Sequence, residues 1–114
     1  MAAQNLILMS HLNKFISLSR DCPWASFEQS EVQFCEEQLC DWITQPANTW
    51  SNLAYIFIGL YIINLAYKER NNFLSIIGYI EVVLGFGSFF FHASSTHIGE
   101  VIDVGSMYLF IAFT

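Results

Sequence analysis

Residues 48–67 read NTWSNLAYIFIGLYIINLAY and contain no charged side chain. A helix of about 20 apolar residues is long enough to cross the hydrocarbon core of a bilayer. Asn48 offers helix-capping chemistry at the start, and Trp50 and Tyr67 stand where an aromatic belt would meet the interface. This stretch predicts a membrane-spanning helix, and an all-α, polytopic transmembrane bundle follows as the expected fold class.

Two further apolar segments follow this helix. One covers residues 73–92, and the other begins near Glu100 and is still apolar at Thr114, too short to span unaided. Lys68 and Arg70 lie in the polar loop after the first span, and positive residues favour the cytoplasmic side. We expect about three helices of a longer, multi-pass integral membrane protein, to which missing C-terminal helices would add.

The first part of the chain has a different character. Residues 1–47 are predicted to form a polar N-terminal segment, and residues 48–114 the first transmembrane helices of a truncated domain. Helical spacing of apolar residues within 1–20 favours an interfacial amphipathic helix, with a disordered tail as the alternative. The remainder, residues 21–47, is expected to be loop with one short helix, since it contains two prolines and most of the acidic residues.

Composition supports a lipid environment and excludes one class of partner. Hydrophobic residues make up 54% of the 114 residues and charged residues only 12%, so the apolar surface must meet lipid or other helices. The net charge of −6 argues against nucleic-acid binding. Of the three cysteines, Cys35 and Cys40 could form a disulfide, although three free thiols are equally compatible with the pattern.

The second apolar segment carries polar residues on one face. Glu81, Gly85, Ser88 and His92 recur at helical spacing, whereas the intervening residues are mostly Val, Leu and Phe. Ionisable side chains inside a span usually face the bundle interior and mark function. A polar turn, residues 92–99, should place the next helix antiparallel, which would bring Asp103 to a similar depth.

Structural explanations of these three residues remain open from the pattern alone. His92 could be an interfacial histidine, Asp103 a helix cap, and Ser88 a packing residue between helices. One histidine by itself does not make a zinc site.

Two segments resemble the alkaline ceramidases and their bacterial relatives. FCEEQLCDWITQPANTWSNLAYIFIGL covers residues 34–60, and GFGSFFFHASSTHIGEVIDVGSMYLF covers residues 85–110. The shared features are the Cys-Glu-Glu entry, the Asn-Thr-x-Ser-Asn helix start, Ser-x-x-x-His and the later aspartate. Alkaline ceramidases belong to a superfamily of seven-helix membrane hydrolases that includes adiponectin-type receptors and GPI-anchor remodelling factors. The sequence is similar to the N-terminal part of a bacterial-type member.

The resemblance implies a set of site residues. His92 matches the first zinc ligand, and Ser88 and Asp103 match the catalytic serine and aspartate beside the metal. The family's other two zinc ligands form a His-x-x-x-His pair in a late helix, so residues 1–114 should bind zinc poorly and be inactive alone. Glu36 and Gln38 match calcium-ligand positions, but fewer carboxylates predict weak calcium binding.

The implied activity is zinc-dependent hydrolysis of the amide bond of a ceramide-like membrane lipid, with calcium as a second possible cofactor. Phe89 and Phe91 are expected to line the path of the substrate's acyl chain in the bilayer. A seven-helix receptor or sensor without hydrolysis, or a purely structural bundle, would be the alternatives.

Overall fold

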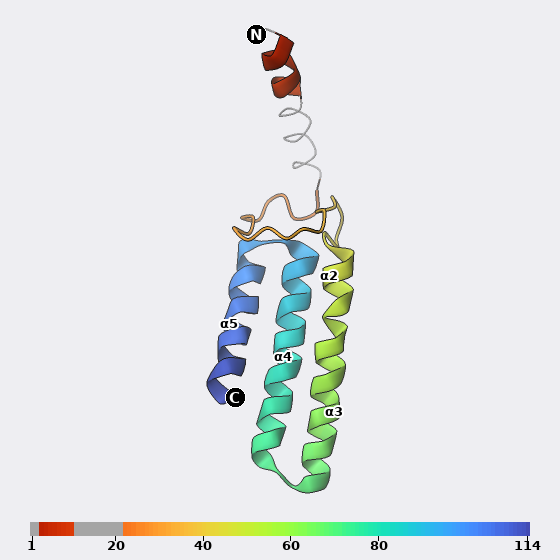
Figure 1. Cartoon of the computed structure of the whole chain (residues 1–114), viewed down its shortest axis with the longest axis vertical. Helices are drawn as coiled ribbons and strands as arrows, with labels where there is room; N and C mark the ends of the chain where they lie inside the picture. The colour runs from red at the N-terminus through yellow and green to blue at the C-terminus, as the bar shows by residue number, and fades with distance from the viewer. Residues whose placement is uncertain (1–2, 11–21) are drawn as a thin grey trace.

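The computed structural model describes residues 3–10 and 22–114. Four helices follow one another within residues 22–114: α2 (Pro46–Ser51), α3 (Leu53–Glu69), α4 (Asn72–Ser94) and α5 (His97–Phe113). Figure 1 shows α3, α4 and α5 running side by side, with successive helices antiparallel. Across the described residues there is no β-strand, only an isolated bridge between Gln29 and Thr96. The prediction of an all-α fold is therefore confirmed.

The predicted first span is formed by two helices in line. α2 and α3 together cover Pro46–Glu69 and are long and apolar enough to cross a membrane. They are separated only by Asn52, whose side-chain amide donates to the carbonyl oxygen of Asn48 at 2.7 Å. Such a side-chain hydrogen bond competes with the regular backbone hydrogen bonds of a helix. It explains why the helix is interrupted at Asn52 although α2 and α3 lie in line.

α4 is the central helix of the bundle. It packs against α3 on one side and α5 on the other, while α3 and α5 make no comparable contact with each other in this part of the chain. α4 is the second helix long and apolar enough to span a membrane. Large apolar side chains stay exposed on all three helices, including Phe57, Phe86 and Tyr108. These surfaces need lipid or further helices as neighbours.

The two connections between the long helices are tight, and each contains a residue with positive φ. Arg70 ends α3 with φ 52°, and Ser95 ends α4 with φ 51°. The predicted polar turn over residues 92–99 is shorter than expected, because only Ser95 and Thr96 lie outside the helices. The Thr96 hydroxyl accepts from the backbone N–H of Gly99 and so starts α5 early.

Glycines allow α3 and α4 to approach closely. A Cβ atom added to Gly59 would lie 2.7 Å from Val82 Cγ2 and 2.9 Å from the carbonyl oxygen of Gly78. The second contact is with backbone and cannot be relieved by a rotamer change. Small residues at such contacts are the usual device for packing helices within a membrane.

We expect Gly59→Leu to lower the free energy of unfolding of the protein in detergent by about 1–3 kcal/mol, because an inserted side chain overpacks this contact. The matched control is Gly105→Leu, since a Cβ at Gly105 meets nothing within 4 Å. Equal destabilisation by both variants in a denaturant titration would contradict the close α3–α4 contact.

Residues 22–45 form an irregular cover over one end of the bundle (Figure 1). The short helix predicted for this region does not form within residues 22–45, and the next helix, α2, begins only at Pro46 as part of the first span. A disulfide joins Cys22 to Cys40, and Cys35 is an exposed free thiol. The suggested pairing of Cys35 with Cys40 is therefore wrong, because the chain folds back to bring the more distant Cys22 beside Cys40.

The cover is attached to the helices at several points. The Trp24 ring packs edge-on to Phe90 of α4, with ring centroids 6.0 Å apart. The backbone N–H of Ser30 donates to the Ser95 carbonyl at 3.1 Å. The backbone N–H of Glu31 donates to the Glu100 carboxylate at 3.0 Å. This segment and the α4–α5 turn therefore lie together at one end of the bundle.

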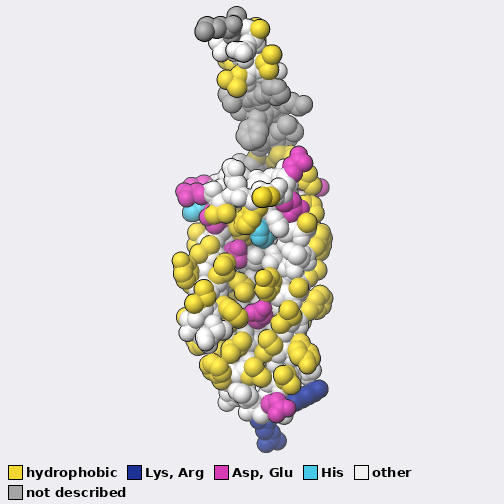
Figure 2. All heavy atoms as spheres, viewed as in Figure 1, with side chains coloured by type: hydrophobic (Ala, Val, Ile, Leu, Met, Phe, Trp, Pro, Cys, Tyr) yellow, Lys and Arg dark blue, Asp and Glu magenta, His cyan; other side chains and the backbone are white. Residues whose placement is uncertain are grey.

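Charge is distributed unequally between the two ends. Figure 2 shows Asp and Glu side chains mostly near the covered end, a broad apolar belt and, among the described residues, the Lys and Arg side chains at the opposite end. Lys68 and Arg70 belong to that opposite end, at the α3–α4 turn. Residues 3–10 are helical with exposed apolar side chains. The rest of the predicted interfacial helix, residues 1–2 and 11–20, lies outside the described residues.

Candidate active site

His92 lies in the last turn of α4, directly beneath the cover. Its side chain is half-buried, and its Nδ1 atom lies 2.8 Å from the Oε1 atom of Gln45. The Phe34 ring packs edge-on to the imidazole with centroids 4.8 Å apart. The imidazole is therefore held on one edge by an amide and covered by an aromatic ring, while the Nε2 atom makes no protein hydrogen bond within residues 22–114.

Thr44 and Gln45 close the end of α4. The last carbonyls of a helix have no partner within the helix and need other donors. The Gln45 N–H donates to the His92 carbonyl at 3.2 Å, and the Thr44 N–H to the Ala93 carbonyl at 2.9 Å. The Thr44 hydroxyl also donates to the His92 carbonyl at 2.9 Å. The backbone that carries His92 is thus fixed by the start of the first span.

Ser88 and Asp103 meet across the α4–α5 contact. Ser88 lies about two turns before Ser95, and Asp103 about two turns after Thr96, so both are roughly 10 Å below the turn. The Ser88 hydroxyl approaches the Asp103 carboxylate, and His92 is near enough to interact with that carboxylate electrostatically. The structure therefore brings together the three residues that the sequence placed at similar depth.

Asp103 occupies an unusual environment for a carboxylate. It is only 8% exposed, and its Oδ1 atom is buried without a hydrogen-bond partner among the described residues. A buried polar atom is normally paired, and an unpaired one requires an explanation. An oxygen left free in this way is suited to receive a proton or a hydrogen bond from a bound molecule.

The same cluster fits part of a zinc site. Catalytic zinc is held by three protein ligands, and residues 3–10 and 22–114 contain no group of three His, Cys, Asp or Glu side chains that could hold a metal. His92 can supply one ligand, since its Nδ1 edge is occupied and its other ring nitrogen is available. Asp103, whose Oδ1 atom has no hydrogen-bond partner among the described residues, interacts electrostatically with His92. Further ligands would have to come from outside the described residues.

Comparison with known protein families identifies the family of this chain. The protein-family model described as Ceramidase matches residues 26–114, which is most of the chain. The chain belongs to the Ceramidase family. No curated protein and no solved structure gives a significant match. Family membership indicates a hydrolase that acts on the amide bond of ceramide, and the two membrane-length helices are consistent with such a lipid substrate.

One of the two predicted calcium ligands, Glu36, has other partners in this Ceramidase-family chain. The two carboxylate oxygens of Glu36 accept from the backbone N–H groups of Ala47 and Asn48, at 2.8 and 2.9 Å. Gln38 is exposed and lies apart from any carboxylate cluster in the described chain. A calcium site normally needs six or more oxygen ligands. These residues do not fit calcium, and Glu36 is better explained as the cap of α2.

We expect Glu36→Ala to lower the free energy of unfolding by about 0.5–2 kcal/mol, the usual effect of losing a helix cap. Glu37→Ala is the matched control, since this neighbouring acid is exposed. Added calcium should leave the unfolding midpoint of the Ceramidase-family protein unchanged. A calcium-dependent stabilisation that disappears in Glu36→Ala would restore the ligand role instead.

The two predicted substrate-lining phenylalanines differ in accessibility. Phe91 is 4% exposed and packs against Phe34, with ring centroids 5.9 Å apart. Its ring has little surface left for an acyl chain. Phe89 is half-buried and packs edge-on to Trp50 of α2 at 5.7 Å. Of the pair, Phe89 is the one placed on an accessible aromatic surface.

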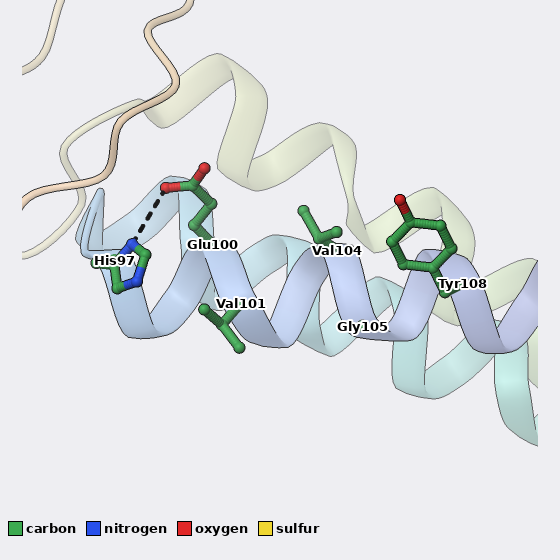
Figure 3. A pocket seen from close by; sticks show the side chains of 6 residues that line it. All are labelled: His97, Glu100, Val101, Val104, Gly105 and Tyr108. Carbon is green, nitrogen blue, oxygen red and sulfur yellow. Dashed lines mark ion pairs between the residues drawn. The ribbon is translucent and has the colours of Figure 1, made fainter.

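A separate groove of about 340 Å³ lies along α5 (Figure 3). Its lining residues all come from one face of that helix: His97, Glu100, Val101, Val104, Gly105 and Tyr108. His97 Nδ1 and Glu100 Oε2 are 3.7 Å apart at one end. The groove includes none of the clustered residues and is distinct from the candidate active site.

One contributor to the site was missed at the sequence level. The Gln45 side chain contacts the imidazole of His92 across the bundle. Nothing in the local pattern around Gln45 signals a partner so far along the chain.

Proposed function

We propose that the complete protein is a multi-pass membrane hydrolase that cleaves the amide bond of a ceramide-like lipid, with zinc held in part by His92. The observation that carries this proposal is the meeting of Ser88, His92 and Asp103 at one end of the bundle, with an unpaired Asp103 oxygen. Family membership supplies the substrate class.

The residues divide the chemistry between them. Zinc, when bound, would act as a Lewis acid toward the substrate carbonyl and favour deprotonation of water. Asp103 accepts the proton of the attacking water and later delivers it to the leaving amine nitrogen. Ser88 donates a hydrogen bond to the oxygen on which negative charge develops. The C–N bond breaks, and a fatty acid and a sphingoid base are released in equal amounts.

The position of the cluster suits a substrate that enters from the bilayer. Ser88 and Asp103 lie roughly 10 Å from the helix ends, which is below the covered end of the bundle. Phe89 and Trp50 form an aromatic contact on the same part of α2 and α4. We propose that an acyl chain lies against this surface while the polar amide reaches the cluster.

The direct test uses the complete protein in bilayer nanodiscs with an N-acyl sphingoid base as substrate. Mass spectrometry should detect fatty acid and sphingoid base in equal amounts, and removal of zinc with a chelator should stop their release. A matched lipid ester without the amide serves as the specificity control. Zinc-containing protein that releases neither product would favour the receptor or sensor alternative.

A further inference from the structure

We propose that Gln45 is a positioning residue that holds His92 in the tautomer required of a metal ligand. This inference rests on the proposed role of His92 in zinc binding. The proposal gives Gln45, which directly precedes α2, a role in the chemistry of His92 in the last turn of α4. Their side chains meet across the contact between α2 and α4.

The hydrogen-bond pattern determines which atom carries the proton. Gln45 Oε1 lies 2.8 Å from His92 Nδ1 and also accepts from the side-chain amide of Asn48 at 3.2 Å. A carbonyl oxygen can only accept hydrogen bonds. His92 Nδ1 must therefore be the donor, which leaves the lone pair of the neutral imidazole on Nε2. Metal-ligating histidines usually have their second nitrogen fixed in this way.

Gln45 is rigidly held, as a positioning residue needs to be. Its side chain is 1% exposed, so water does not compete for the amide oxygen. Its backbone N–H donates to the His92 carbonyl, and its own carbonyl accepts from the Thr49 N–H at 2.8 Å. Main chain and side chain of Gln45 therefore contact the same histidine. The ring orientation is set by protein groups alone, before any metal binds.

The arrangement also argues against Gln45 as a metal ligand itself. Its amide oxygen already accepts from two donors, His92 Nδ1 and Asn48 Nδ2. Turning this oxygen toward a cation would leave both donors without their partner. The structure favours an indirect contribution of Gln45 to zinc binding, through the imidazole.

The test combines a spectroscopic and a binding measurement on the complete protein in detergent micelles. Histidine labelled with ¹⁵N reports the tautomer, because the protonated and unprotonated ring nitrogens resonate far apart. Zinc affinity is measured separately by competition with a chelator. The variants are Gln45→Leu, which removes the acceptor, and Gln45→Glu, which keeps an oxygen at the same reach. Gln29→Leu is the matched control on an exposed glutamine of the cover.

In the metal-free wild type, His92 should be protonated at Nδ1. Gln45→Leu should lose this preference and bind zinc about 10–100-fold more weakly, as for other partners of metal-ligating histidines. Gln45→Glu should restore both properties, and Gln29→Leu should change neither. An Nε2-protonated His92 in the wild type, or an unchanged zinc affinity in folded Gln45→Leu, would overturn the proposal.

Failure of the proposed function would give a different result. Wild-type protein that binds no zinc would refute the zinc assignment of His92 and with it the metal-positioning role of Gln45, whatever the tautomer. Wild-type protein that binds zinc with an Nε2-protonated metal-free His92 would refute the role of Gln45 alone.

Discussion

Replacing His92 with alanine in the complete protein is expected to remove stoichiometric zinc and to reduce lipid-amide hydrolysis to background. Among the described residues, His92 is the only histidine in the cluster with Ser88 and Asp103, and its Nε2 edge is open. A catalytic zinc site with three protein ligands retains little affinity once one of them is lost. Elemental analysis of purified protein gives the zinc content directly, where the wild type should contain about one ion per chain.

His97→Ala is the matched control for this experiment. His97 begins α5, is half-exposed, and contacts Glu100 rather than the cluster. Its replacement should leave zinc content and hydrolysis unchanged. Retention of stoichiometric zinc by His92→Ala would disprove the ligand assignment, and equal loss of zinc in both variants would point to general destabilisation of this end of the bundle.

Asp103→Asn is expected to keep zinc and to lose activity by about 10²–10⁴-fold, the usual contribution of a general acid–base residue. The substitution preserves the shape of the buried side chain but removes its ability to take up a proton. Initial rates of sphingoid-base release, measured beside the zinc content of the same samples, separate a catalytic defect from loss of metal.

Glu100→Gln provides the comparison for Asp103→Asn. Glu100 lies about one turn earlier on α5 and accepts from the Glu31 backbone at the rim of the cover. The Glu100→Gln protein should hydrolyse the lipid at close to the wild-type rate. A fully active Asp103→Asn would exclude Asp103 as the base, and the unpaired Oδ1 atom would then need another explanation.

The candidate site could be anticipated from sequence to the extent that helix geometry is regular. Ser88 and His92 are one turn apart on one helix, and a short turn places Asp103 opposite them. Their meeting follows from the periodicity of two antiparallel helices and needs no knowledge of side-chain packing. The predicted turn over residues 92–99 was too long, yet Ser88 on α4 and Asp103 on α5 still lie at similar distances from it, with His92 one turn closer.

The contributions of the N-terminal cover could not be anticipated in the same way. Glu36 matches a calcium-ligand position in sequence, whereas in the structure it caps α2 through two backbone N–H groups. Cys22 pairs with Cys40 and not with a nearer cysteine. Irregular segments have no periodicity from which contacts can be deduced, so their partners depend on how the whole segment folds over the helices.

By itself, the sequence determined that this protein is an apolar helical bundle with a polar cluster near one end, because membrane-length apolar runs and helical spacing are local properties of the chain. Only the tertiary structure decided what surrounds that cluster. Contacts between residues far apart along the chain produce the hydrogen bond between Gln45 and His92 and the capping of α2 by Glu36. They also bury Phe91. Such contacts are selected by the packing and hydrogen-bond satisfaction of the complete fold, and no local pattern records them.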